Sequence, residues 1–177
     1  MTSSFSTAAP VRRCSWATND LLIEYHDKEY GRLTPSDQAI FEKICLESFS
    51  AGLSWYIVLT KRDALRASFC GFDPEKCAAM TDEALENAMQ NPEIIRNRRK
   101  IEAVRMNARA CLAISEEHGG LMPFVRSYRG GRALAAAMRE YGVRQFGPVC
   151  AAELQKSLGL IPAHEPDCAF AQRAVES

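Results

Sequence analysis

Residues 141–159 read YGVRQFGPVCAAELQKSLG, and the glycines and proline divide this segment into a helix end, a turn and a second helix. A helix over about 132–141 is expected to end at Gly142, because glycine is favoured just past a helix C-terminus. Gly147-Pro148 then opens a helix that closes at Gly159. The backbone amides of such a helix pair can meet a DNA phosphate. An ordinary αα-hairpin is at least as common, so the pattern predicts the pair and leaves its role open.

Upstream of this pair the chain also reads as helices separated by short turns, with no convincing strand of alternating polarity. Thr34-Pro35 is expected to open a helix as N-cap and first residue, with Asp37 in the capping-box position. Ser54 is expected to cap one further helix that runs to about residue 71. Other helices are expected from Asp73-Pro74, from Thr81 and over about 98–117.

The predicted architecture is therefore one compact all-α domain over residues 13–170. Residues 1–12 are expected to be a flexible leader and residues 171–177 a tail. Seven cysteines without a signal peptide predict reduced thiols and an intracellular protein. No apolar run is long enough to span a bilayer, so no membrane association is expected.

Charge is balanced over the whole chain but clustered locally. The 22 basic and 22 acidic residues cancel, which argues against binding nucleic acid by bulk electrostatics. Basic residues nevertheless crowd the region from Arg96 to Arg109, where Lys100, Arg105 and Arg109 are expected on the surface of the long helix. A solvated helix face and a local phosphate-contacting patch both remain open.

Two cysteines and two histidines near the chain ends form a candidate metal-binding set: Cys14, His26, His164 and Cys168. Two Cys and two His make a closed tetrahedral set for a structural Zn²⁺, with no open position for water. One shared ion would join the N-terminal and C-terminal segments. The spacing of His164 and Cys168 alone arises by chance in a chain with seven cysteines.

Aromatic side chains gather near this set, at Trp16, Tyr25, Tyr30 and Trp55. Their flat faces, together with the carboxylate of Glu47, would suit a planar cationic ring that carries N–H groups. Each aromatic taken alone is more often simply part of a core. Glu47 stands among apolar neighbours, where a carboxylate is either paired, protonated or at a site. An exposed position on the helix surface is the alternative.

The sequence lacks the motifs of several other enzyme classes. The sequence contains no nucleoside-deaminase zinc pattern, phosphate-binding Walker loop, dinucleotide fingerprint or H-E-x-x-H motif. No serine is marked out as a nucleophile by a neighbouring histidine and acid.

Taken together, these residues resemble the bacterial 3-methyladenine DNA glycosylase I family, a zinc-bearing branch of the helix-hairpin-helix glycosylases. The resemblance covers roughly residues 13–168, and its strength lies in many short segments in the same order. The segments are Cys14-Ser15-Trp16, Tyr25 to Gly31, Phe41 to Glu47, Ala51 to Trp55, Phe72-Asp73-Pro74, Ile94 to Ile101, Asn107-Ala108, Phe146-Gly147-Pro148, His164 and Cys168.

The resemblance implies a helix-hairpin-helix glycosylase fold in which Cys14, His26, His164 and Cys168 hold structural zinc. It further implies that Trp16, Tyr25, Tyr30, Glu47 and Trp55 line the pocket for an extruded methylated adenine, with Glu47 as the catalytic residue. The aromatic faces would favour the cationic ring over neutral adenine.

The implied reaction is hydrolysis of the N-glycosidic bond of 3-methyladenine in alkylated double-stranded DNA, which leaves an abasic site. A monofunctional enzyme without lyase activity is expected, because no lysine is expected in the pocket to form a Schiff base. The implied protein is a monomer in the bacterial cytoplasm, associated with the nucleoid.

The chain departs from the family pattern near the expected pocket. Tyr30 stands where the family usually has Trp, and Ser48-Phe49-Ser50 replaces a Gly/Gln-containing stretch. The helix after Pro148 differs, and Ala163 replaces an acid before His164. These departures, with the zero net charge, leave the alternative of a zinc-stabilised DNA-binding module with weakened catalysis. A third possibility is an enzyme that acts on free nucleosides, and the basic residues from Arg96 to Lys100 argue against it.

Overall fold

The computed structural model describes residues 11–171, and within this range the chain forms ten α-helices and one 3₁₀ turn and no strand. The expected all-α fold is confirmed. Most of the expected leader and tail, residues 1–10 and 172–177, lies outside the described range. In chain order the elements are α1 Asp20–Lys28, α2 Asp37–Ser50, α3 Trp55–Thr60, α4 Arg62–Ser68, η1 Cys70–Phe72, α5 Pro74–Ala78, α6 Asp82–Gln90, α7 Arg98–His118, α8 Leu121–Ser127, α9 Gly131–Glu140 and α10 Pro148–Ser157.

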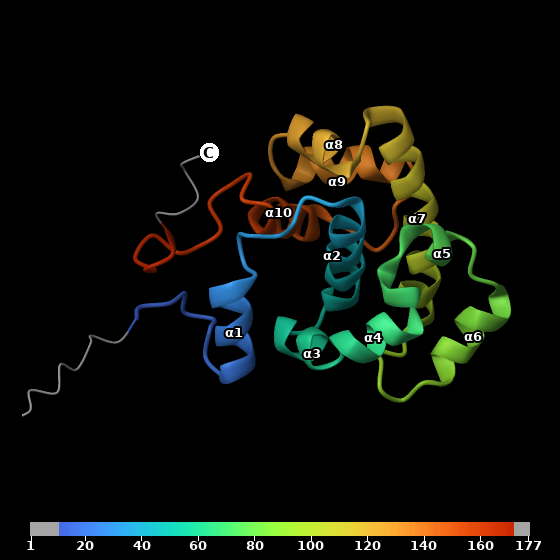
Figure 1. The fold of residues 1–177 in the computed structure, drawn as a ribbon, viewed down its shortest axis with the longest axis horizontal. Helices are drawn as coiled ribbons and strands as arrows, with labels where there is room; N and C mark the ends of the chain where they lie inside the picture. Colours follow the sequence, from blue (N-terminus) through green and yellow to red (C-terminus); the bar gives the residue numbers. More distant parts are fainter. Residues whose placement is uncertain (1–10, 172–177) are drawn as a thin grey trace, which may run out of the picture.

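Helix α2 forms the centre of the molecule. Figure 1 shows it between α1 and α7, with α10 beside it, and it packs directly on α7 and α10. Every residue from Ile40 to Phe49 except Glu42 is buried, so α2 has almost no solvent face. A helix surrounded in this way must pair its polar side chains internally, because an unpaired buried charge is costly. Lys43 and Glu47 are the two charged groups to which this applies.

Several expected N-caps are confirmed, since Ser54, Asp73 and Thr81 each accept a hydrogen bond from a backbone N–H in the first turn. The expected cap at Thr34 is wrong. Ser36 caps α2 by accepting from Ala39 N at 3.2 Å. Asp37 makes no capping box and instead accepts from the Ser115 hydroxyl and from Leu121 N, which ties the start of α2 to the start of α8.

The single helix expected from Ser54 to about residue 71 is also wrong, because Lys61 leaves helical geometry and separates α3 from α4. Two further helices, α1 and α8, were not expected. Helix α1 has a polar N-cap, Asn19, whose side chain accepts from Leu22 N at 3.1 Å. Helix α8 begins after Gly120 without any side-chain cap.

The expected helix pair is present as α9, a turn over 141–147, and α10. The two helices cross so closely at Gly131 that a Cβ there would lie 2.1 Å from the Pro148 carbonyl oxygen. Val143 and Phe146 are buried and fasten the turn to the core. Asn107 of α7 completes the attachment, since its amide exchanges two hydrogen bonds with the backbone of Arg144.

Several side chains of the basic cluster form ion pairs or hydrogen bonds with other groups of the same chain. Arg98 pairs with Glu86 at 2.9 Å, and Arg105 pairs with Asp82 at 2.8 Å. Lys100 was expected at the surface but is buried, and its ammonium donates to the Phe49 and Ala51 carbonyls at 2.8 and 2.6 Å. Burial lowers the pKa of Lys100. These contacts favour the interpretation of the cluster as a structural helix face that also caps the end of α2.

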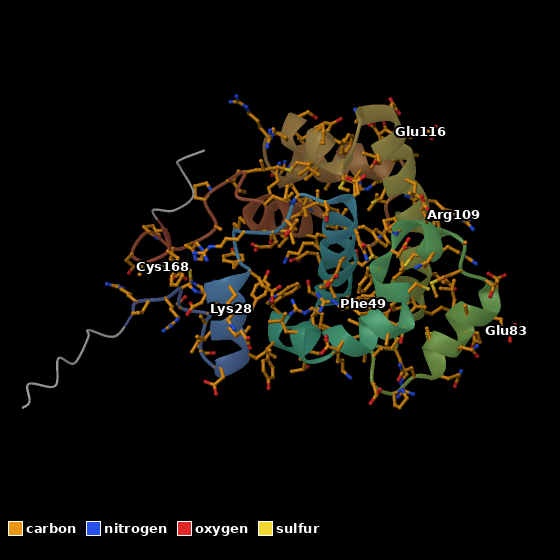
Figure 2. The ribbon with its side chains drawn as sticks, viewed as in Figure 1. Lys28, Phe49, Glu83, Arg109, Glu116 and Cys168 are labelled. Carbon is orange, nitrogen blue, oxygen red and sulfur yellow. The ribbon has the colours of Figure 1, made fainter. Side chains whose placement is uncertain are left out.

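The two ends of the described chain lie side by side. Ala169 N donates to the Arg12 carbonyl at 2.8 Å, and Ser15 N donates to the Glu165 carboxylate at 2.8 Å. Figure 2 shows Cys168 next to the N-terminal segment, on the side of the molecule opposite Glu83 of α6. Over residues 11–171, no helix combines the length and apolar character that crossing a bilayer requires.

Candidate active site and metal centre

A cavity of about 850 Å³ opens between α1, α2, the connection into α3, α10 and the C-terminal segment. It brings together five residues that the sequence analysis placed in a pocket: Trp16, Tyr25, Tyr30, Glu47 and Trp55. Its volume falls in the range typical of small-molecule sites. Trp16 and Glu165, 149 positions apart in the sequence, both line this cavity.

The aromatic side chains form a continuous surface in this cavity. The ring centroids of Trp16 and Tyr30 are 5.1 Å apart, and those of Tyr25 and Trp55 are 5.4 Å apart. Tyr25 and Tyr30 are 7% and 6% exposed, so only limited parts of these rings meet the cavity. Such a surface presents flat π-faces to a planar ligand.

Glu47 lies at the polar end of the cavity, and its exposed helix-face alternative is excluded because the residue is 5% exposed. One carboxylate oxygen, Oε1, is 2.7 Å from the Lys43 ammonium. The other, Oε2, accepts from the Ser50 hydroxyl at 3.3 Å, and the same hydroxyl donates to the Glu47 backbone carbonyl at 2.8 Å. Ser50 belongs to the altered stretch after Glu47, so this departure bears directly on the carboxylate.

Lys43 is a pocket residue that the sequence analysis missed, and the expectation of a pocket without lysine is wrong. Its ammonium donates to the Tyr25 hydroxyl at 3.0 Å and lies 3.8 Å from the centre of the Trp55 ring. Burial opposes the charged form, but Tyr25 and Glu47 together raise the pKa of Lys43 above its ordinary value. The four-residue spacing of Lys43 and Glu47 on an apolar helix was the available signal.

Helix α10 supplies a second polar pair to the wall. Glu153 and Lys156 are 2.7 Å apart, and the Tyr30 hydroxyl donates to Glu153 at 3.3 Å. Burial and the Glu153 charge raise the pKa of Tyr30, so this hydroxyl keeps its proton. Lys156 also lines the cavity, as does Ala163. The departures in α10 and before His164 therefore reshape this cavity rather than a distant surface.

The four candidate metal ligands come together behind the aromatic wall, with their ligand atoms all within 4.8 Å of one another. His26 Nε2 is 3.1 Å from His164 Nδ1 and 3.4 Å from Cys168 Sγ, while Cys14 Sγ is 3.5 Å from His164 Nδ1. A tetrahedral zinc ion holds S and N ligands about 3.3–3.8 Å apart, so the spacing is close to that of such a set. Cys14, His26, His164 and Cys168 thus form a group that can bind a metal ion.

The chemistry of the two histidine donors agrees with this geometry, whereas burial raises the pKa of the Cys14 thiol to about 11. Burial, with the nearby His26, lowers the pKa of His164, which keeps its ring neutral as a metal ligand must be. His26 uses its other nitrogen, Nδ1, to contact Asp27 at 2.8 Å, and Arg13 pairs with Asp27 at 2.8 Å. A carboxylate behind a ligating histidine is the usual means of fixing its ring. The sequence analysis missed Asp27 and Arg13, although Asp27 directly follows His26.

The candidate metal group also supports the cavity. The Trp16 and His26 rings are 5.3 Å apart, and those of Tyr30 and His164 are 5.2 Å apart. Two of the candidate ligands therefore contact two of the aromatic residues that line the cavity. Moving the chain ends would move that side of the cavity with them.

Comparison with known proteins agrees with these features. Residues 16–133 match the family model described as "Methyladenine glycosylase". The chain is 36% identical to the DNA-3-methyladenine glycosylase of Haemophilus influenzae, over 88% of this chain and 96% of that protein. It is 35% identical to DNA-3-methyladenine glycosylase 1 of Escherichia coli K12, over 89% and 96% of the two chains.

A similar fold is found in 3-methyladenine DNA glycosylase I from Staphylococcus aureus, in a structure that addresses recognition of 3-methyladenine. The TM-score is 0.83 at 30% identity, and the match covers 90% of this chain and 96% of that one. Sequence and structure comparisons therefore point to one family.

Proposed function

This chain belongs to the methyladenine glycosylase family, and from that membership we propose that it is a DNA-3-methyladenine glycosylase. It would hydrolyse the N-glycosidic bond of 3-methyladenine in alkylated DNA and leave an abasic site. The observation that carries the proposal is the buried carboxylate of Glu47 at the end of an aromatic cavity. A flat, methylated base with N–H groups on its edge is the ligand that such a cavity fits.

In this proposal Trp16, Tyr25, Tyr30 and Trp55 surround the extruded base, and Glu47 accepts a hydrogen bond from its amino group. Methylation at N3 puts positive charge on the ring and weakens the bond to the sugar, so the leaving base needs little acid catalysis. Water then adds to the sugar as the bond breaks. A damaged base also unstacks more readily than a normal one, which adds selectivity.

We further propose that the enzyme is monofunctional, although lysines are present in the cavity. A Schiff base needs an unprotonated amine. Tyr25 and Glu47 together raise the pKa of Lys43, so its side chain is held as an ammonium. Lys156 is paired with Glu153. Neither amine is prepared as a nucleophile, which supports hydrolysis without lyase chemistry.

Double-stranded DNA would approach the hairpin side of the cavity in a helix-hairpin-helix mode. A groove of about 520 Å³ at the turn is lined by Arg139, Arg144 and Gly147, and it shares Ala51 and Cys150 with the base cavity. Arginine side chains and the start of α10 are suited to phosphate contacts. We expect a monomer that acts on DNA in the bacterial cytoplasm, associated with the nucleoid.

We propose Zn²⁺ as the metal of the Cys14, His26, His164 and Cys168 group, because two thiols and two imidazoles favour it over harder ions. The ion would stabilise the two chain ends as a structural centre. Catalysis would remain with the cavity residues.

The test is release of free 3-methyladenine from methylated duplex DNA by the wild type and by Glu47→Gln. We expect Glu47→Gln to lose about 100-fold or more in single-turnover rate, because an amide replaces the carboxylate acceptor. Glu42→Gln is the matched control, since Glu42 lies on the same helix but contacts Arg66 outside the cavity. It should release the base at the wild-type rate.

Two results would contradict the proposal. Unchanged release by Glu47→Gln would remove Glu47 from the reaction. No release by a folded, metal-loaded wild type that still binds abasic DNA would instead support the weakened DNA-binding module.

A further inference from the structure

The polar end of the cavity carries no net charge, because Lys43 and Glu47 face each other at 2.7 Å. Both belong to the buried part of α2, and the Lys43 residue is 6% exposed, so solvent screens this pair weakly. The other cavity lysine, Lys156, has its own partner in Glu153. An incoming ligand therefore meets a neutral pair at this end of the cavity, while the Glu165 carboxylate on the chain-end side accepts from Ser15.

The ammonium of Lys43 also occupies the position that a cationic ligand would prefer. It lies 3.8 Å from the centre of the Trp55 ring and 5.5 Å from that of Tyr25. These distances are within the range of a cation–π contact, so one face of the Trp55 ring already has a cation. A second positive charge in the same cavity would be repelled.

The same ammonium sets the direction of the hydrogen bonds at the pocket edge. A protonated lysine only donates, so the Tyr25 oxygen must accept from Lys43 and the Tyr25 O–H proton is left to point elsewhere. Glu47 still offers lone pairs on its carboxylate. The edge therefore presents a donor beside an acceptor, a pattern that matches the amino group and an adjacent ring nitrogen of adenine in either charge state. A preference between the two charge states must come from the charge of Lys43 itself.

We propose that Lys43 is a specificity-determining residue that makes the cavity prefer the neutral 3-methylated purine over its positively charged form. This inference rests on the proposed glycosylase function. In DNA the N3-methylated adenine is cationic, and when the C1′–N9 bond breaks the bonding pair stays on N9 and neutralises the ring. Positive charge develops on the sugar, and addition of water with loss of its proton completes the hydrolysis. A cavity that favours the neutral ring favours the leaving group over the intact nucleotide.

The test compares two ligands of almost the same shape. Neutral 3-methyladenine represents the leaving group, and 3,9-dimethyladeninium, a permanent cation with a methyl in place of the sugar, represents the base before cleavage. Affinities are measured calorimetrically for wild type, Lys43→Met and Lys43→Arg, at a pH where 3-methyladenine is neutral. Lys28→Met is the matched control, because it removes a lysine that pairs with Glu24 outside the cavity.

We expect the wild type to bind the neutral ligand about tenfold or more tightly than the cation. Lys43→Met should shift this ratio by about tenfold or more toward the cation, while Lys43→Arg and Lys28→Met keep the wild-type ratio. If Lys43→Met does not fold, Lys43→Gln provides the same comparison with a donor retained for Glu47.

A wild type that prefers the cation, or an unchanged ratio in Lys43→Met or Lys43→Gln, overturns the role of Lys43. If either result is found while the wild type excises the base normally from DNA, the proposed glycosylase function is retained and only the role of Lys43 is rejected. A wild type that neither excises 3-methyladenine nor binds either ligand overturns both proposals.

Discussion

At the scale of single residues, the base cavity and the hairpin both depend on buried polar side chains with distant partners. Asn107 is fully buried in α7, and its amide accepts from Arg144 N at 2.7 Å and donates to the Arg144 carbonyl at 3.1 Å. The turn between α9 and α10 would otherwise leave these backbone groups without a partner. One side chain thus fixes the position of the hairpin on the core.

Asn107→Ala should destabilise the protein by about 1–3 kcal/mol, because the fully buried amide and its two hydrogen bonds to the Arg144 backbone are lost. Denaturant unfolding gives the free energy directly. Met106→Ala is the neighbouring control, since Met106 is 42% exposed and should change stability little. We also expect weaker binding to duplex DNA with retained binding of free 3-methyladenine. Equal stabilities of the two variants would show that Asn107 does not hold the turn.

Glu47 and the aromatic residues could be predicted as pocket residues because they stand in short sequence motifs. It missed Lys43 as a pocket residue, Lys100 as a buried cap and Asn107 as a turn anchor. Lys100 meets carbonyls about 50 positions away and Asn107 meets a backbone 37 positions away. Such pairings depend on how the helices pack, which the sequence does not state. Lys43 lies only four residues from Glu47, but its burial follows from the position of α2 at the centre.

At the scale of elements, the closest approach in the hairpin depends on the absence of a side chain at Gly131. A Cβ there would lie 2.1 Å from the Pro148 carbonyl oxygen and 2.7 Å from the Ala152 amide nitrogen. Both are backbone atoms of α10, so relief requires α10 itself to move. The same helix carries Glu153 and Lys156 into the cavity. Packing of α9 on α10 therefore affects the site as well as stability.

Gly131→Ala should destabilise the fold by about 3 kcal/mol or more, because the clash is with backbone and cannot be relieved by a rotamer change. Gly147→Ala is the control in the same hairpin, since Gly147 has open space around its Cβ position and a φ of −92°. It should cost only about 1 kcal/mol or less. Thermal unfolding of both variants measures the difference, and a Gly131→Ala Tm equal to that of Gly147→Ala would refute the packing argument.

Helix boundaries were predictable where the start signal is local. Ser54, Asp73 and Thr81 each bond to their own first turn, and each was expected. The errors arise where tertiary contacts decide. Asp37 bonds to α7 and α8 rather than to its own helix, and α8 begins without a capping side chain. Helix α1 does carry a local signal at Asn19, and this one was overlooked.

At the scale of the whole molecule, the chain ends meet through polar contacts and the candidate metal group. The contacts of Arg12 with Asp167 and of Ser15 with Glu165 lie at the exposed surface, so they contribute little to stability. The candidate metal group lies beneath them, with Cys14, His26 and Cys168 buried. We therefore expect a bound ion to stabilise the joined ends, and with them the side of the cavity formed by Trp16 and Tyr30.

Cys168→Ala should lose the metal and destabilise the protein by on the order of 3 kcal/mol, because binding to the folded state alone stabilises that state. For a chain of this size the Tm should fall by about 6–12 °C. A strong chelator should lower the wild-type Tm in the same direction and leave Cys168→Ala unchanged. Cys70→Ser is the control, since Cys70 is an exposed free thiol outside the group.

Metal analysis is decisive: one tightly bound zinc ion per Cys168→Ala chain would show that the ligand set is wrong. If the ion is structural, excision by Cys168→Ala at low temperature, where the fold persists, should fall less than excision by Glu47→Gln.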